Sequence, residues 1–207
     1  MGGIVVVSGP SGVGKGTLIA GLLRRLSNVR VKISDTTRAP RVGEVNGVNY
    51  NFISVSEFRQ RIEAEYYIEW EYFFNTYYGT PKSELEVLKA GEFVVLELDP
   101  KGALSIQRSY RNATLVFILP GSIEQLNSQL AKRATEPPEQ RSVRTARLIE
   151  ELDLAHQFDY AIVNRDLDTA IDEFCGLFNI LRFGIANQHD FIVELRKKAG
   201  DALNGLH

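Results

Sequence analysis

The residues with the clearest chemistry lie near the N-terminus, where glycines and a lysine follow a short apolar run. The segment reads Gly9-Pro10-Ser11-Gly12-Val13-Gly14-Lys15. Glycines let backbone N–H groups turn inward around an anion, a following helix adds partial positive charge at its N-terminus, and a lysine reaches the outer phosphates of a nucleotide. Because the segment lies between a predicted strand and a predicted helix, it predicts a phosphate-binding loop, or P-loop.

Oxygen-bearing side chains near this loop predict a metal site. A strict P-loop motif places Ser or Thr directly after the lysine, whereas this chain has Gly16 and then Thr17. Further along, Glu97-Leu98-Asp99 ends a long apolar run. Carboxylates at strand ends lie where ligands collect in open α/β sheets, and they hold Mg²⁺ through water. We therefore predict that Thr17, Glu97 and Asp99 hold a magnesium ion.

The elements that must position these residues alternate along the chain. Apolar runs rich in β-branched residues predict strands at residues 4–7, 30–34, 93–98, 114–119 and 160–163. Helical periods lie between them: leucines from Leu18 to Leu26 mark one helix, Thr80-Pro81 opens and Gly91 closes a second, and Ser122 with Gln125 forms the capping box of a third. Continuous apolar strands are typical of parallel sheets buried on both faces. The pattern predicts an α/β fold with a parallel sheet covered by helices.

Two stretches interrupt this alternation. Residues 34–80 contain short polar and aromatic runs and a helix opened by Ser54 and Glu57, which predicts a small sheet-and-helix insert. Pro137-Pro138 lies between two predicted helices and indicates a mobile lid over about residues 129–145. We expect residues 1–33 and 81–184 to form the core, and residues 185–207 to form a helical tail.

Composition narrows the class of protein. The chain has 207 residues, 44% of them apolar, and a formal net charge of −2. Such values are typical of one globular unit and argue against nucleic acid or anionic membrane as the main partner. The single cysteine, Cys175, excludes a disulfide framework, and the first apolar run is too short for a signal peptide or a membrane span. We expect a cytoplasmic protein; nothing in the sequence predicts its oligomeric state.

The nucleotide class depends on motifs beyond the P-loop. Asp99-Pro100-Lys101-Gly102 matches the Asp-x-x-Gly motif of GTPases. However, Asn164-Arg165-Asp166-Leu167 has leucine where a GTPase needs a base-binding aspartate, which argues against a GTPase. In the insert, Thr36-Thr37-Arg38-Ala39-Pro40-Arg41-Val42-Gly43-Glu44 sets two arginines around a Pro and Gly loop. Arginine forks bind phosphate oxygens in pairs, so the insert predicts a second phosphate site.

Together with Glu69-Trp70, Tyr77-Tyr78-Gly79-Thr80 and the P-loop, this segment resembles the guanylate kinases over residues 4–171. The resemblance implies a three-layer P-loop kinase core with a small mixed α/β insert that binds the nucleoside monophosphate, and a lid. It implies Mg²⁺-dependent transfer of the γ-phosphoryl group of ATP to GMP, giving ADP and GDP. The residues implied in ATP binding are Gly9, Pro10, Ser11, Gly12, Val13, Gly14, Lys15, Gly16, Thr17 and Asn164. Those implied in GMP binding are Ser34, Arg38, Arg41, Glu44, Tyr50, Glu69, Tyr78, Thr80 and Asp99.

The guanine assignment also makes chemical sense. The carboxylate of Glu69 can accept from guanine N1–H and the exocyclic amine, and the hydroxyl of Thr80 can donate to O6. Adenine would leave the same pair mismatched and desolvated, so we expect strong discrimination between the purines.

The resemblance implies catalytic roles for Lys15, Arg133 and Arg144, but the chain departs from the family pattern at several positions. Gln129 replaces the first lid arginine and Ala134 a lid glycine, while Glu97 and Lys101 stand where Asp and Gln are usual. Two alternatives remain open: a weak or inactive guanylate-kinase-like binding module, and a kinase of the same fold that acts on a phosphorylated sugar.

Overall fold

Two sheets organise the chain. The computed structural model describes residues 3–73, 75–83, 91–132, 141–184 and 188–204. The larger sheet has five strands in the order β2-β7-β1-β8-β9, and every neighbouring pair is parallel. Its strands are β1 (Gly3–Ser8), β2 (Val29–Val31), β7 (Phe93–Glu97), β8 (Thr114–Pro120) and β9 (Tyr160–Asn164).

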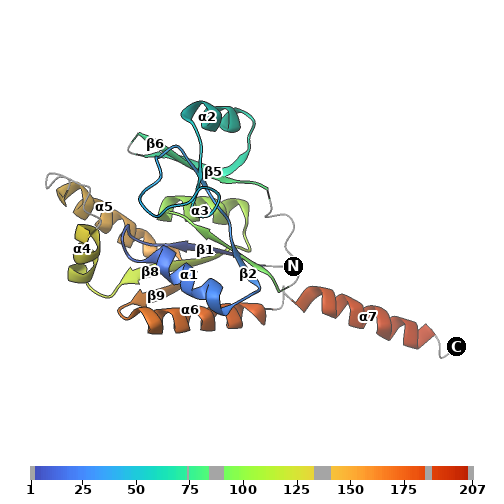
Figure 1. The fold of residues 1–207 in the computed structure, drawn as a ribbon. Coiled ribbons are helices and arrows are strands. Elements are labelled where there is room, and N and C mark those ends of the chain that lie inside the picture. Colours follow the sequence, from blue (N-terminus) through green and yellow to red (C-terminus); the bar gives the residue numbers. More distant parts are fainter. Residues whose placement is uncertain (1–2, 74, 84–90, 133–140, 185–187, 205–207) are drawn as a thin grey trace.

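Helices cover both faces of this sheet, which explains its nearly continuous apolar strands. Within β1, Val5 and Val7 pack into one core cluster with α1 (Lys15–Arg25) and α6 (Leu167–Arg182). Val6 points to the opposite face and packs with residues of α3 (Pro100–Ser109). Figure 1 shows α1 and α6 below the sheet and α3 above it. The predicted three-layer α/β fold is confirmed.

The smaller sheet lies within residues 34–81 and has four strands in the order β4-β3-β6-β5. Its strands are β3 (Asp35–Thr36), β4 (Asn51–Phe52), β5 (Tyr67–Phe73) and β6 (Thr76–Pro81). Helix α2 (Val55–Glu63) begins at the predicted cap, where the backbone N–H of Glu57 donates to Ser54 Oγ over 3.1 Å. Figure 1 shows this sheet and α2 standing above α3.

The structure corrects two predicted boundaries. Thr80 and Pro81 end strand β6 instead of opening a helix, because β6 pairs with β5 in antiparallel register as far as Pro81. The rest of that predicted helix, residues 84–90, lies outside the described residues. The strand predicted over residues 30–34 ends at Val31, and the chain then crosses to the other sheet as β3.

The remaining helices follow the core strands. Helix α4 (Ile123–Lys132) begins at its predicted capping box, with Gln125 N donating to Ser122 Oγ over 3.1 Å. Helix α5 (Arg141–Asp153) leads through the 3₁₀ turn η2 (Leu154–Gln157) to β9, and α7 (His189–Asn204) forms the tail. Residues 133–140 of the predicted lid are not described. Among the helices that are, none is long and apolar enough to cross a bilayer.

Candidate active site

The P-loop connects the end of β1 to the start of α1. Gly9, Gly12 and Gly14 all adopt left-handed backbone angles, with φ of 136°, 87° and 96°. Helix α1 begins at Lys15 without a side-chain cap, so its first N–H groups are available to an anion. The Lys15 ammonium lies over its own loop, 2.6 Å from the carbonyl oxygen of Gly9 and 3.2 Å from that of Pro10. This geometry is that of a phosphate-binding loop.

Close packing makes two of these glycines necessary. A Cβ at Gly9 would lie 2.3 Å from the carbonyl oxygen of Ile118 in β8. A Cβ at Gly14 would lie 2.8 Å from Asn164 Nδ2, and the same amide donates to the carbonyl of Val13 over 2.8 Å. Asn164 is buried beneath the loop and supports its backbone. Its expected contact with the ATP adenine stays a prediction.

The carboxylates predicted to hold metal lie beside this loop. Parallel pairing sets Glu97 of β7 level with Val7 of β1, and a Cβ at Gly16 would lie 3.7 Å from Glu97 Oε2. Asp99 caps α3, since its Oδ1 accepts from the backbone N–H of Gly102 over 2.7 Å.

No group of three or more His, Cys, Asp or Glu side chains within the described residues could hold a metal ion. Oxygen donors from Thr17, Glu97 and Asp99 fit Mg²⁺, which takes one or two carboxylates together with nucleotide phosphates and water. Their role as metal ligands stays a prediction.

Glu44 accepts hydrogen bonds across the loop that carries the two insert arginines, Arg38 and Arg41. Both guanidinium Nη atoms of Arg38 donate to the Glu44 carboxylate at 2.9 Å, and the backbone N–H of Arg41 donates to it at 2.6 Å. The hydrogen bond from Arg38 lowers the pKa of Glu44 below its usual value. Glu44 therefore holds Arg38 in place as a charged partner.

Aromatic side chains fix the position of this pair. The Arg38 guanidinium lies 5.5 Å from the centre of the Tyr50 ring, which in turn meets the Tyr78 ring at 6.1 Å. Burial raises the pKa of Tyr50 to about 12, so its hydroxyl stays protonated at neutral pH and can donate a hydrogen bond.

The predicted guanine pair is in contact. The Thr80 hydroxyl donates to Glu69 Oε1 over 2.7 Å, and Ser34 Oγ lies 3.4 Å from Thr80 Oγ1. Thr80 is fully buried, and its hydroxyl donates to Glu69. The predicted hydrogen bond from Thr80 to guanine O6 stays a prediction. Burial raises the pKa of Glu69 to about 7, and the charge of Asp99 adds to the rise.

A cavity of about 820 Å³ brings the two halves of the site together. Sixteen of the predicted site residues line it: Gly9, Ser11, Gly12, Gly14, Lys15, Gly16, Thr17, Ser34, Arg38, Arg41, Glu44, Tyr50, Glu69, Tyr78, Glu97 and Asp99. The P-loop and the arginine loop thus line one space, with carboxylates between them. Four predicted residues lie outside this lining and are buried: Pro10, Val13, Thr80 and Asn164.

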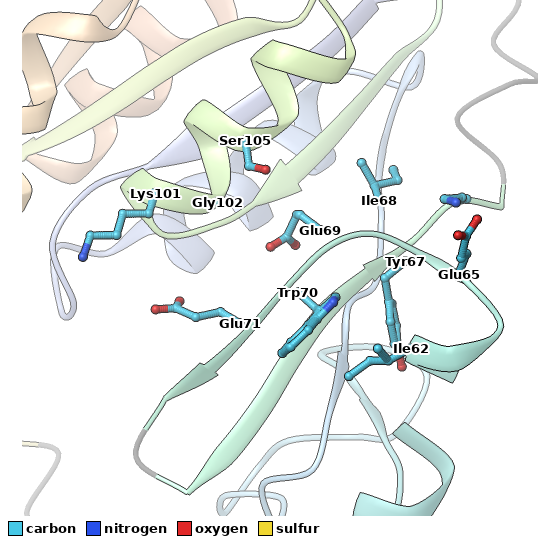
Figure 2. A pocket seen from close by; sticks show the side chains of 11 residues that line it. Ile62, Glu65, Tyr67, Ile68, Glu69, Trp70, Glu71, Lys101, Gly102 and Ser105 are labelled. Carbon is cyan, nitrogen blue, oxygen red and sulfur yellow. The ribbon is translucent and has the colours of Figure 1, made fainter. Parts of the chain in front are cut away.

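A second cavity, of about 530 Å³, lies between β5 and α3. Figure 2 shows that Glu69 and Glu71 point toward the start of α3, whereas Trp70 points to the other side of the strand. Both carboxylates line the two cavities. A register shift between Tyr67 and Glu69 lets Ile68 pack on the core beneath α3 while Glu69 faces the site.

The comparison with protein families decides the identity of this arrangement. The family model described as guanylate kinase matches residues 1–179. The chain belongs to the guanylate kinase family.

Similar proteins agree with this assignment. A guanylate kinase of Caldanaerobacter subterraneus subsp. tengcongensis is 37% identical over 95% of this chain and 96% of its own. One of Gloeobacter violaceus is 45% identical over 82% of this chain and 83% of its own. The crystal structure of guanylate kinase from Anaplasma phagocytophilum matches with a TM-score of 0.73 and 29% identity, over 88% of this chain and 87% of that one. The chain is a nucleoside monophosphate kinase, and nothing in these comparisons favours an inactive binding module.

The lid of this guanylate kinase is only partly described. Arg133 lies outside the described residues, and Arg144 lies in α5 without a described side chain. One turn after Arg144, Arg147 lines the large cavity. Its Nε donates to Glu151 Oε1 over 2.7 Å, and its Nη2 lies 3.8 Å from Asp99 Oδ2. The catalytic roles of Arg133 and Arg144 stay predictions.

Three carboxylates near the site escaped the sequence analysis. Glu71 faces Asp99, and burial together with this interaction raises its pKa to about 7. Glu151 holds Arg147 with the spacing of one helical turn. Asp35 is fully buried in the insert and accepts from Asn51, Tyr67 and Arg61. Alternation along β5 could have placed Glu71 beside Glu69, but no local pattern indicates the long-range partners of Asp35.

Proposed function

We propose that the large cavity binds ATP against the P-loop and GMP against the insert, and that it transfers the γ-phosphoryl group between them with Mg²⁺. One observation carries this proposal: the P-loop, the arginine loop and Glu69 line a single cavity. Two anionic nucleotides held on opposite walls of one space are in position to react.

ATP would bind through the backbone N–H groups of the P-loop and through Lys15. The ammonium of Lys15 donates to two carbonyls of its own loop, so it already lies where the phosphates would bind. A hydrogen bond from this cation to a phosphate oxygen gains the attraction between opposite charges, which a carbonyl acceptor does not supply. Asn164 would keep the loop in its binding shape from beneath.

GMP would bind through its phosphate to Arg38, Arg41, Ser34, Tyr50 and Tyr78. Arg38 is already held against Glu44, so little side-chain freedom is lost when the phosphate arrives. The protonated hydroxyl of Tyr50 supplies a donor.

The base would lie against Glu69, whose carboxylate accepts from guanine N1–H and N2–H. Thr80 holds that carboxylate through its own hydroxyl. Adenine offers an acceptor at N1, so it would leave a buried carboxylate facing a lone pair, an arrangement that costs about 1–3 kcal/mol or more.

Phosphoryl transfer requires alignment and charge stabilisation more than covalent help. A phosphate oxygen of GMP attacks the γ-phosphorus of ATP, and the bond to the bridging oxygen of the β-phosphate breaks, so that ADP leaves and GDP forms. Mg²⁺, held by Thr17, Glu97 and Asp99 through water, would neutralise charge on the phosphates. Lys15 and the lid arginines would stabilise the moving group.

A coupled assay of the purified full chain with AMP, GMP, CMP, UMP and dTMP tests this proposal. Turnover with GMP should exceed turnover with every other acceptor, and it should stop when EDTA removes Mg²⁺. Preference for another base would refute the guanine assignment. We also propose a cytoplasmic role in guanine nucleotide supply.

Substitution of the P-loop lysine checks the ATP side. Lys15→Ala should lower kcat by about 10²–10³, the loss expected when one donor to a developing charge is removed. Lys197→Ala, an exposed position on α7, is the matched control and should leave kcat unchanged. Equal kcat values for Lys15→Ala and the wild type would remove Lys15 from the catalytic machinery.

A further inference from the structure

Glu71 lies in the wall of the large cavity, although the proposed reaction gives it no role. It follows Glu69 by two residues in β5, so both side chains leave the same face of the strand. Figure 2 shows both pointing toward the start of α3, with Lys101 on the same side of β5. Because both carboxylates line the large cavity, Glu71 lies where it can touch the acceptor nucleotide.

We propose that the Glu71 carboxylate accepts a hydrogen bond from the ribose 2′-hydroxyl of GMP and so makes the enzyme prefer GMP to dGMP. This inference rests on the proposed function, because it takes the base and the phosphate of GMP to lie where that function puts them. A carboxylate is a common partner of the ribose 2′-hydroxyl in nucleotide sites. Glu71 would then determine sugar specificity, as Glu69 determines base specificity.

The register of the small sheet sets Glu71 beside the space between the base site and the phosphate site. Glu69 is opposite Thr80 in β6, at the level of the proposed guanine contacts. Glu71 is opposite Tyr78, whose ring meets that of Tyr50 in the proposed phosphate site. Opposite residues of an antiparallel pair present their side chains on the same face. At about 3.3 Å per residue, the Cα atom of Glu71 is about 7 Å further along β5 than that of Glu69, in the direction of the phosphate site.

The order of the strands keeps Glu71 away from the phosphate itself. The small sheet runs β4-β3-β6-β5, and the loop that carries Arg38 and Tyr50 connects β3 to β4 on one side. Glu71 lies on β5 at the opposite edge. The 2′-hydroxyl is attached next to the carbon that carries the base, whereas the 3′-hydroxyl is nearer the phosphate. With guanine against Glu69, the 2′-hydroxyl would therefore lie on the β5 side of the sugar.

The charges around Glu71 favour a neutral donor over a phosphate. The Glu71 carboxylate interacts with that of Asp99, and the cations of Arg147 and Lys101 lie close enough to attract it. Arg147 Nη2 also lies 3.8 Å from Asp99 Oδ2. Two carboxylates repel a phosphate group, and the two cations balance their charge. A sugar hydroxyl fits these surroundings, because it donates a hydrogen bond and brings no net charge.

Kinetics with matched acceptors test the proposal. The wild type should phosphorylate GMP with a kcat/KM about tenfold or more above that for dGMP, the gain expected from a hydrogen bond to a charged group. The 3′-deoxy analogue of GMP should behave as GMP does. Because the contact is made before chemistry and kept during it, the difference should lie in KM and leave kcat unchanged. Equal kcat/KM values for GMP and dGMP would overturn the proposal.

Substitution of Glu71 assigns the preference to this residue. Glu71→Ala should abolish it, giving equal KM values for GMP and dGMP. Glu71→Gln keeps an acceptor oxygen without the charge and should retain part of the preference. Glu63→Gln, at an exposed carboxylate on α2, is the matched control and should retain all of it. A preference in Glu71→Ala as large as in the wild type would overturn the ribose contact, even if both KM values had risen.

Binding without chemistry separates this contact from a role in metal binding. Calorimetry of GMP and dGMP in EDTA, without ATP, should show the same preference, since a ribose contact needs no metal ion. Loss of the preference in EDTA would assign Glu71 to the metal site beside Asp99 and overturn the proposal. Absence of GMP turnover in the wild type would refute the proposed function as well, whereas turnover without a sugar preference would refute only the role of Glu71.

Discussion

At the scale of single residues, the carboxyl group of Glu69 determines how the site depends on pH. Burial raises its pKa to about 7, so the charge of Glu69 changes over the neutral pH range. Only the ionised form accepts from both guanine N–H groups. GMP binding should therefore release protons from this residue.

We expect the KM for GMP to rise as pH falls from 8 to 6, because protons compete with the base for Glu69. Calorimetry of GMP binding in buffers of different ionisation enthalpy should show proton release near pH 7 that becomes smaller as pH rises to 9. The Glu69→Gln variant should lose the proton release that comes from Glu69. The release that remains in this variant would come from the GMP phosphate. Identical proton release in the variant and the wild type would contradict the assignment.

At the same scale, the lid lacks one cation of the family pattern. Gln129 lies in α4, where the resemblance expects an arginine. Gln129→Arg should raise kcat by roughly tenfold, since a hydrogen bond to a charged group contributes about 1.5 kcal/mol. Steady-state kinetics at saturating ATP and GMP measure this change. An unchanged kcat would mean that the existing lid cations suffice.

At the scale of elements, one buried aspartate joins the parts of the insert. Asp35 in β3 accepts from Asn51 Nδ2 over 2.8 Å, from the Tyr67 hydroxyl over 2.9 Å and from Arg61. These contacts tie β4, β5 and α2 to the short strand β3. Three elements of the insert thus depend on one carboxylate, and one of them, β5, carries Glu69.

Asp35→Asn should lower the free energy of unfolding by about 3 kcal/mol, because it leaves the Arg61 cation without its buried partner. Urea denaturation measures this loss. Asp172→Asn is the matched control: it breaks an exposed pair with Arg25, which solvent screens, so its effect on stability should be much smaller.

Asp35→Asn should also raise the KM for GMP and leave the KM for ATP unchanged, since only the insert is affected. Equal stability losses in Asp35→Asn and Asp172→Asn would refute the structural role of Asp35.

At the scale of the whole molecule, the site is built between two sheets. The parallel sheet supplies the P-loop, Glu97 and Asp99, and the smaller sheet supplies Glu69 and the arginine loop. Cavities of about 820 Å³ and 530 Å³ lie where these parts meet. Ligands that bridge the cavity should therefore hold the two sheets together.

GMP at 100 times its dissociation constant should stabilise the folded state by about 2.7 kcal/mol. Thermal unfolding with and without GMP measures the effect, and AMP at the same concentration should give little change. Hydrogen exchange should slow in β5 and β6 on GMP binding. Equal stabilisation by AMP and GMP would contradict selective binding by the insert.

The sequence by itself determined the local features of this protein. The P-loop, the caps at Ser54 and Ser122, and the five core strands follow from short-range patterns, because backbone torsions and apolar periodicity are set by neighbouring residues. The arginine loop was recognisable because its residues are contiguous.

Tertiary structure decided the contacts between residues that are far apart in the sequence. Thr80 and Pro81 read locally as the start of a helix, but pairing with β5 makes them a strand end. The partners of Asp35 and Glu71, and the raised pKa of Glu69, depend on burial and on charges far away in the chain. Such interactions arise only when folding removes water from groups that the sequence keeps apart, and no local pattern encodes them.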